Sequence, residues 1–125
     1  MYDIIGDIHG HAQPLNALLK TLGYTTHEGV YSHPENRQVI FLGDFIDRGP
    51  HILETLFIAK SMVDAGTALV VMGNHEFNAL AYHTKHPTTD RYLRVHSEKN
   101  QKQHQATLDA LNDSQLADYL TWFAT

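Results

Sequence analysis

The stretch Val39-Ile40-Phe41-Leu42-Gly43-Asp44-Phe45-Ile46-Asp47-Arg48-Gly49 carries the pattern that decides the fold. It begins with a short β-branched and aromatic run that ends at Gly43, and mostly polar residues follow. Pro50 then suits the first turn of a helix, whose apolar residues recur at helical spacing up to Val63 before Gly66 ends the pattern. This order predicts a buried strand, a polar loop and a helix.

The same unit occurs once before and once after this stretch. Tyr2 to Ile5 are followed by Gly6 and a helical pattern, and Ala68 to Met72 are followed by Gly73 and the helix-compatible residues 76–82. Short apolar strands that alternate with helices are typical of α/β folds, and they predict a βαβαβ unit with a parallel sheet that is buried on both faces. Because the carboxyl ends of parallel strands lie at one edge, we expect the three glycine-containing loops to converge there.

The other segments differ in character. Residues 24–37 are polar and irregular, which predicts a loop or a hairpin. Beyond residue 82, the segment from Lys85 to His104 is polar and basic, and the apolar spacing after it indicates two helices broken near residues 112–114. We therefore expect a core over residues 1–82 and a helical insert or cap over residues 83–125. Residues 119–125 have no capping or polar tail, which favours a longer parent chain that continues into a further strand.

The composition fits one globular domain, since the chain has 125 residues, of which 42% are hydrophobic and 18% charged. A formal net charge of -5 disfavours attraction to nucleic acid or anionic lipid. The chain has no cysteine, no signal-peptide pattern and no apolar run of membrane-spanning length, so we expect a cytoplasmic location. Its ten histidines and loop aspartates suit a divalent metal such as Mn, Fe, Zn or Mg.

Each of the three loops holds a candidate metal ligand. Asp7 and His9 lie two residues apart, so both side chains can point to one side and chelate one ion, although a turn with a solvated carboxylate is the alternative. The carboxylate of Asp44 can bridge two ions, as in two-metal hydrolases. Asn74 offers a neutral amide oxygen to the second ion, or it caps the helix that follows.

Candidate catalytic residues stand beside these ligands. In one interpretation the Asp47 carboxylate holds the tautomer of His75, so that His75 can protonate a leaving alkoxide. Arg48 can donate two parallel hydrogen bonds to phosphate oxygens. The alternative is a surface salt bridge between Asp47 and Arg48 beside a solvated His75.

Together the loops resemble the three N-terminal motifs of the calcineurin-like metallophosphoesterase superfamily: Gly6-Asp7-Ile8-His9-Gly10, Gly43-Asp44-Phe45-Ile46-Asp47-Arg48-Gly49 and Gly73-Asn74-His75-Glu76. They are similar in particular to the branch of serine/threonine protein phosphatases and bacterial diadenosine-tetraphosphate hydrolases. The resemblance covers residues 1–82 and implies one half of a metallophosphoesterase α/β sandwich. Its implied metal ligands are Asp7 and His9 for the first ion, Asp44 as the bridge and Asn74 for the second ion. The resemblance further implies that His75 and Asp47 form the acid pair and that Arg48 contacts the substrate phosphate. Glu76 would be structural.

The resemblance also implies a metal-dependent phosphohydrolase that cleaves a phosphomonoester or phosphoanhydride with metal-activated water. Two divalent ions are expected in the complete family site, manganese first and iron, zinc, nickel or magnesium as alternatives. Whether this chain alone holds both ions, one or none is left open. The expected substrate is a phosphoprotein, a dinucleoside polyphosphate or a small phosphate ester, and no membrane or nucleic acid is expected as a partner. The alternative is a truncated, catalytically silent fragment that binds metal and phosphate.

Later parts of the family pattern are missing from the chain. The complete family site also uses histidines that follow later strands, whereas the histidines after residue 82 lie in a polar segment that we expect to be helical, without a preceding strand. We assign none of them a ligand role, and we expect a surface position for His27, His33, His86, His96 and His104. Because the second half of the sandwich is also missing, we expect an exposed apolar face that favours a homodimer or marginal stability.

Overall fold

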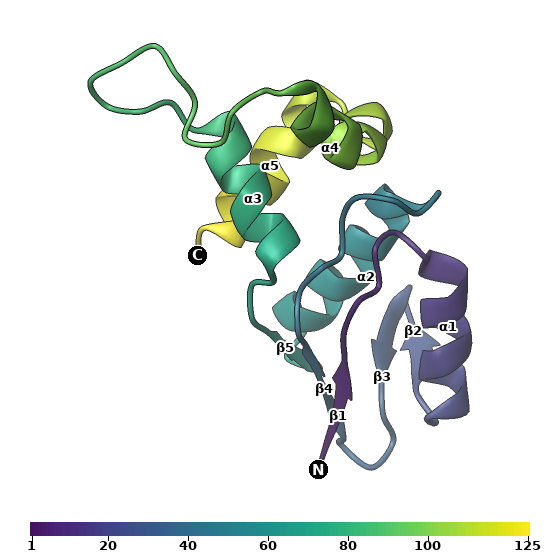
Figure 1. Cartoon of the computed structure of the whole chain (residues 1–125). Coiled ribbons are helices and arrows are strands. Elements are labelled where there is room, and N and C mark those ends of the chain that lie inside the picture. Colours follow the sequence, from purple (N-terminus) through teal and green to yellow (C-terminus); the bar gives the residue numbers. More distant parts are fainter.

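The computed structural model describes residues 1–125. At its centre lies a parallel sheet of three short strands, β1 (Tyr2–Ile5), β4 (Gln38–Phe41) and β5 (Ala68–Val70), with β4 in the middle (Figure 1). The helices α1 (Ala12–Thr21), α2 (Ile52–Asp64) and α3 (Asn74–His83) come after β1, β4 and β5 respectively. The α/β class, the threefold strand-loop-helix unit and the parallel pairing are therefore confirmed.

The two faces of the sheet have different surroundings. Val39 pairs with Asp3 and Ala68, and this face packs on α1 and α2, whose apolar residues share one core cluster with it. On the opposite face, Ile40 pairs with Ile4 and Leu69, whose exposed fractions are 68% and 49%. The prediction of a sheet buried on both faces is wrong for this chain, because no element among residues 1–125 covers the second face. The expected exposed apolar face is present.

Helices α1 and α2 form because their apolar residues recur on one side. In α1 the buried residues are Ala12, Leu15 and Leu19, and in α2 the buried positions recur from Ile52 to Met62. Lys20 lies in the last turn of α1, where a positive charge interacts favourably with the helix dipole. Burial of these side chains holds both helices against the sheet.

The irregular segment before β4 forms a hairpin, as one of the two predicted alternatives. Strands β2 (Thr25–His27) and β3 (Val30–Ser32) pair antiparallel. The buried Tyr31 connects the hairpin to α1, because its hydroxyl donates a 2.7 Å hydrogen bond to Asn16. The Thr67 hydroxyl donates to the carbonyl of Tyr31 at 2.8 Å, which attaches β3 to the start of β5.

The segment after α3 consists of a long loop and two helices. The loop of residues 84–97 extends away from the body of the molecule (Figure 1), and it is followed by α4 (Glu98–Ala110) and α5 (Asp113–Phe123). Asn112 caps α5 by accepting a hydrogen bond from the Gln115 backbone, so the predicted break near residues 112–114 is confirmed. Helical structure over the whole of residues 83–104 is wrong, since α4 begins only at Glu98. The division of the chain at residue 82 stays a prediction.

None of the helices combines the length and the apolar character that crossing a bilayer requires.

Candidate metal and catalytic site

Backbone hydrogen bonds hold the first two loops together at the carboxyl edge of the sheet. The amides of His9 and Gly10 donate to the carbonyls of Asp44 and Phe45, each at 2.7 Å. The amide of Gly49 donates back to the carbonyl of His9, also at 2.7 Å. Two segments that are far apart in the sequence therefore have a fixed relative position, and the convergence expected from the strand order is present.

The third loop approaches the second one so closely that side chains are excluded. A β-carbon on Gly43 would lie 2.1 Å from the amide nitrogen of Gly73, which is far inside van der Waals contact. Gly43 also has a φ of 77°, a conformation that a residue with a side chain adopts only with strain. Only glycine at position 43 permits this contact between the two backbones.

Glu76, in the first turn of α3, connects the same two loops through its carboxylate. It accepts hydrogen bonds from the amides of Asp44, Phe45 and Gly73 at 2.5, 2.9 and 3.1 Å, and it is 1% exposed. Burial raises the pKa of Glu76, and the three amide hydrogen bonds offset only part of that increase. The prediction that Glu76 is structural is confirmed.

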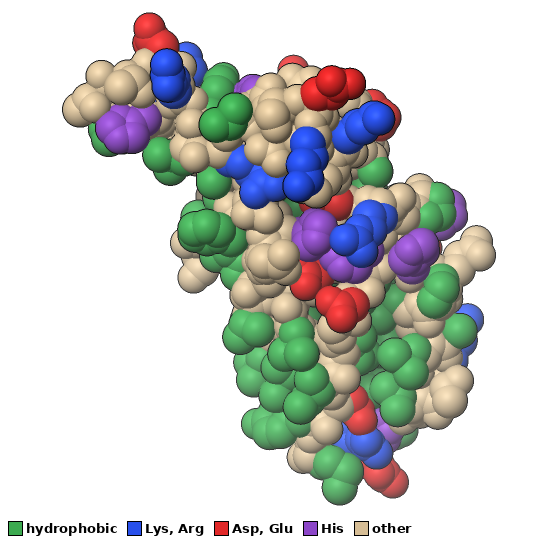
Figure 2. Space-filling model, in the orientation of Figure 1, with side chains coloured by type: hydrophobic (Ala, Val, Ile, Leu, Met, Phe, Trp, Pro, Cys, Tyr) green, Lys and Arg blue, Asp and Glu red, His purple; other side chains and the backbone are tan.

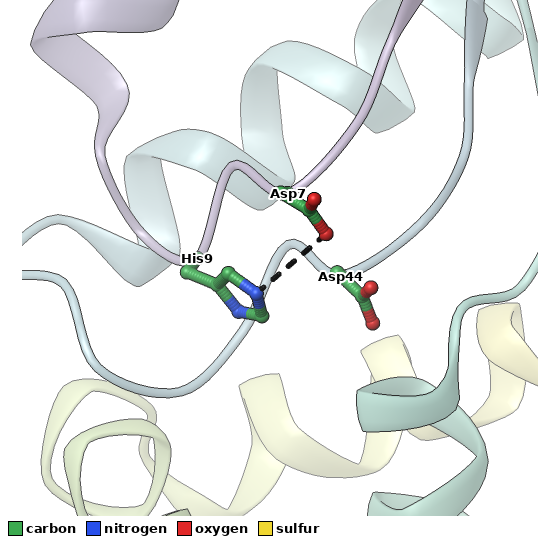
Figure 3. A group of neighbouring side chains, drawn as sticks. All are labelled: Asp7, His9 and Asp44. Atoms are coloured by element: carbon green, nitrogen blue, oxygen red, sulfur yellow. Dashed lines mark ion pairs between the residues drawn. The ribbon is translucent and has the colours of Figure 1, made fainter.

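Asp7, His9 and Asp44 bring their ligand atoms together at the junction of these loops (Figure 3). One ligand atom from each lies within 4.8 Å of the others, and His9 Nε2 is 4.0 Å from Asp7 Oδ1. All three residues have a positive φ, at 54°, 47° and 55°, which is uncommon for residues other than glycine. Backbone strain of this kind is concentrated at functional sites.

The ring of His9 is oriented for metal binding. Its Nδ1 lies 3.1 Å from the carbonyl oxygen of Ile46, and because a carbonyl only accepts, Nδ1 must carry the proton. The unprotonated Nε2 then faces Asp7 and can donate its lone pair to a cation.

Asn74 completes a donor set that fits a divalent cation. Its amide lies beside the Asp44 carboxylate, with one amide atom 3.0 and 3.2 Å from the two carboxylate oxygens. If that atom is nitrogen, it donates hydrogen bonds to Asp44; if it is oxygen, two acceptors face one another, which is favourable only around a cation. Carboxylate, imidazole and amide ligands together suit Mn, Fe, Zn or Mg. The helix cap before α3 is Gly73, so the alternative role of Asn74 as the cap is not adopted.

Asp47 and His75 lie in direct contact. Nδ1 of His75 donates to Asp47 Oδ2 at 2.8 Å, and the backbone amide of His75 donates to Asp44 Oδ1 at 3.1 Å. The rings of His75 and His9 also meet edge to face, with centroids 4.5 Å apart. His75 is therefore adjacent to the cluster of metal-ligand candidates, and the solvated position that formed the alternative is not adopted.

The prediction of a surface position is wrong for His104, which is buried. It is 5% exposed, and its Nδ1 donates to Asp47 Oδ1 at 2.8 Å. Thr107, one turn further along α4, donates its hydroxyl to the same oxygen at 2.7 Å. No local pattern in the sequence indicates this contact, because burial of the polar helix α4 depends on how it packs on α2.

Three hydrogen-bond donors surround the Asp47 carboxylate and affect its pKa. Burial raises the pKa of Asp47, but the hydrogen bonds from His104, His75 and Thr107 outweigh that effect and hold the pKa below its ordinary value. Asp47 is therefore ionised at neutral pH, and both imidazoles present a protonated Nδ1 to it. Behind His104 lies His83, with the two Nε2 atoms 3.0 Å apart.

Arg48 is exposed beside this network and makes no ion pair within the chain, so the alternative salt bridge to Asp47 is absent. It lines a polar cavity of about 570 Å³ together with Asn74, His75, Asn78, Lys102, Gln103 and Ala106. Figure 2 shows basic side chains gathered over the helical part of the molecule, directly above histidine and acidic side chains of the loops.

Comparison with known proteins agrees with this geometry. The family model described as calcineurin-like phosphoesterase matches residues 2–122. The chain belongs to this family. As a calcineurin-like phosphoesterase, it is 47% identical over 74 residues to the bis(5'-nucleosyl)-tetraphosphatase PrpE (asymmetrical) of Halalkalibacterium halodurans, which covers 59% of this chain and 30% of that protein. The corresponding protein of Bacillus subtilis is 43% identical over 74 residues, with coverage of 59% and 30%.

This phosphoesterase chain thus spans about 30% of the length of these relatives. Among solved structures, a cold-active protein tyrosine phosphatase aligns with a TM-score of 0.57 at 22% identity, covering 95% of this chain and 35% of that one, which shows the fold. A mutant of a cold-active protein tyrosine phosphatase aligns with a TM-score of 0.51 at 27% identity, covering 69% and 28%. The superfamily and the branch that the motifs resemble are confirmed.

Proposed function

We propose that this chain carries the metal-binding loops and the proton donor of a metal-dependent phosphohydrolase that cleaves a phosphoanhydride bond of a dinucleoside polyphosphate. The observation that carries the proposal is the convergence of Asp7, His9 and Asp44 within 4.8 Å, beside a hydrogen-bonded Asp47–His75 pair. The similarity to bis(5'-nucleosyl)-tetraphosphatases supports the choice of bond.

The three loops supply the metal ligands in this proposal. Asp7 and His9 would hold one divalent ion, Asp44 would lie between two ions, and Asn74 would bind the second, with manganese as the expected metal. When bound, such ions supply an activated water and neutralise charge on the phosphoryl oxygens.

His75 would act as the general acid. The Asp47 carboxylate fixes the proton on Nδ1, so Nε2 is the atom that can deliver a proton to the oxygen of the leaving group. A phosphoanhydride leaves as a phosphate oxygen that needs less protonation than an alkoxide, and we therefore expect the contribution of His75 to depend on the leaving group.

The cavity beside Arg48 would bind the phosphate chain. Arg48 can form two parallel hydrogen bonds to phosphoryl oxygens, and Lys102 lines the same cavity from α4. The positively charged side chains of Arg48 and Lys102 line the same polar cavity of about 570 Å³, and two such charges favour the binding of a polyphosphate over that of a single phosphate group.

An assay of the chain with Mn²⁺ against p-nitrophenyl phosphate and a bis(5'-nucleosyl) tetraphosphate tests the proposal. Asp44→Asn removes the bridging carboxylate but preserves its size. Because even indirect partners of a metal contribute about 10- to 100-fold, we expect this change to reduce turnover by about 100-fold or more. Asp64→Asn is the matched control, since Asp64 is exposed and pairs only with Lys60 on α2. Equal turnover by the two variants contradicts the proposal.

The second candidate function is a catalytically silent module that binds metal and phosphate. It is favoured by the small number of ligands for a second ion, which this chain provides only through Asp44 and Asn74. Titration with Mn²⁺ by calorimetry separates the two candidates. Binding that depends on Asp44 without any turnover supports the silent module, and binding with turnover supports the hydrolase.

A further inference from the structure

The carboxylate of Asp47 is held by α4 as well as by His75. Asp47 and His104 are 57 residues apart in the sequence, and Asp47 and Thr107 are 60 apart. All three are buried, with exposed fractions of 4%, 5% and 1%. The Asp47–His75 pair is therefore supported by further hydrogen bonds to Asp47, and both of these come from α4.

Both carboxylate oxygens of Asp47 accept hydrogen bonds, and they accept them from different residues. Oδ1 accepts from His104 Nδ1 and Thr107 Oγ1, and only Oδ2 remains for His75. The Thr107 hydroxyl also accepts a 2.9 Å hydrogen bond from the backbone amide of Asp47. One threonine therefore fixes the backbone and the side chain of a residue whose φ is 67°.

The ring of His104 is itself fixed at both nitrogens. Its Nδ1 faces Asp47, and its Nε2 lies 3.0 Å from Nε2 of His83 at the end of α3. Tyr82 packs against the same ring, with centroids 5.1 Å apart. No buried polar side-chain atom in the chain lacks a hydrogen-bond partner, so this network is complete, as a rigid polar network requires.

We propose that His104 and Thr107 are positioning residues for the proton donor: they lock the Asp47 carboxylate in the rotation that aims Oδ2 at Nδ1 of His75. The proposal rests on the proposed function, because it assigns α4 a task in that reaction. Without the two contacts, the carboxylate rotates freely and Oδ1 competes for the His75 proton. The imidazole then spends less time with Nε2 directed at the leaving group.

Isosteric variants test this assignment. Thr107→Val removes one hydroxyl, His104→Phe keeps a ring without a donor, and His104→Asn keeps a donor close to the place of Nδ1. Thr55→Val is the matched control, since Thr55 is a fully buried helical threonine in α2 whose hydroxyl donates to the carbonyl of His51 and makes no hydrogen bond to Asp47, His75 or His104.

The kinetic readout compares phenyl phosphate with p-nitrophenyl phosphate. The two substrates bind alike but differ in leaving-group basicity, and a poorly placed acid affects the more basic leaving group more. General acids contribute about 100- to 10,000-fold, so we expect Thr107→Val and His104→Phe to lower kcat for phenyl phosphate by roughly 10-fold or more. We expect a much smaller loss for p-nitrophenyl phosphate, little change in KM and recovery in His104→Asn. Equal losses for both substrates overturn the positioning role.

A second measurement does not depend on turnover. The Nδ1 proton of His75, hydrogen-bonded to Asp47, gives a downfield proton NMR signal that a His75→Asn variant identifies. We expect Thr107→Val and His104→Phe to broaden or shift this signal, whereas Thr55→Val and His104→Asn preserve it. An unchanged signal in both disruptive variants overturns the proposal even if the chain has no activity. Absence of Mn²⁺-dependent turnover together with a displaced signal instead contradicts the proposed function alone.

Discussion

At the scale of single residues, Gly43 shows how little freedom the site leaves to its backbone. Gly43→Ala combines a positive φ with a β-carbon only 2.1 Å from the amide nitrogen of Gly73. Gly29 is a matched control, because its φ of 81° is similar and no atom lies within 4 Å of its added β-carbon. The comparison separates conformational strain from close contact.

We expect Gly29→Ala to lower the free energy of unfolding by about 1–2 kcal/mol, the cost of a left-handed residue with a side chain. Gly43→Ala should cost about 1–3 kcal/mol more, because the added carbon overpacks the loop contact. Urea denaturation followed by circular dichroism measures both values. Equal losses in the two variants would show that the loops can separate at no cost.

The histidine pair behind Asp47 predicts a dependence of stability on pH. Burial first, and then electrostatic repulsion from the neighbouring His104 and His96, lower the pKa of His83 from 6.5 to about 4. A depressed pKa favours the folded state when His83 is neutral, so this contribution is complete above pH 6.5 and is lost as the pH falls towards 4.

We therefore expect the melting temperature to fall more steeply between pH 7 and pH 4 in the wild-type chain than in His83→Gln, by on the order of a few °C. Scanning fluorimetry across this range measures the slopes. His27→Gln serves as the control, because His27 is exposed on β2. A His83→Gln slope as steep as that of the wild type contradicts the prediction.

The sequence predicts some of these contacts and not others, for a physical reason. Asp47 and His75 stand in motifs that follow strands, so the sheet topology alone places them at one edge. His104 lies in a polar helix without such a context, and its burial is a property of packing. Local sequence patterns predict which helices and strands form, but they do not predict which side of a polar helix is buried against the rest of the protein.

At the scale of elements, α4 both contacts Asp47 and lines the polar cavity, and its polar sequence indicates neither. One side carries His104 and Thr107 to Asp47, and Lys102 lines the cavity beside Arg48. The sequence predicted the helix and the break after it, but it also extended helical structure into residues 84–97, which form a loop. That loop has only one isolated bridge, between Lys85 and Tyr92, because its apolar residues have no core to face.

Lys102→Ala tests the contribution of α4 to substrate binding. An exposed ion pair contributes up to about 1 kcal/mol, so we expect KM for a bis(5'-nucleosyl) tetraphosphate to rise roughly three- to fivefold. KM for p-nitrophenyl phosphate should change little if its single phosphate is bound by Arg48 without Lys102, as the proposed function has it. Lys99→Ala on the same helix is the control, since Lys99 does not line the cavity. Equal effects on both substrates contradict a binding role for Lys102.

At the scale of the whole molecule, one side of the sheet remains exposed. Ile4, Ile40 and Leu69 form a row across the three strands, and Figure 2 shows hydrophobic side chains gathered over this part of the molecule. Exposed apolar patches favour association, and we propose that isolated chains dimerise through this face.

Leu69→Lys tests the proposed dimer by sedimentation velocity. A charge at the β5 end of the row should shift the chain towards the monomer and reduce binding of an apolar dye. Leu93→Lys is the control, because Leu93 is 54% exposed but lies in the loop that extends away from the sheet (Figure 1). A Leu69→Lys chain that sediments like the wild type contradicts dimerisation through the sheet.

The contacts among the three loops also determine how a metal would enter. The hydrogen bonds between the first two loops use backbone atoms, and those of Glu76 use a carboxylate that is not among the candidate metal ligands. We therefore expect the cation to meet a preorganised chelate, unlike the ion of a zinc finger, whose binding energy is also its folding energy. We expect a chelator to remove the metal while the circular dichroism spectrum stays unchanged, so that metal exchange and unfolding are independent events.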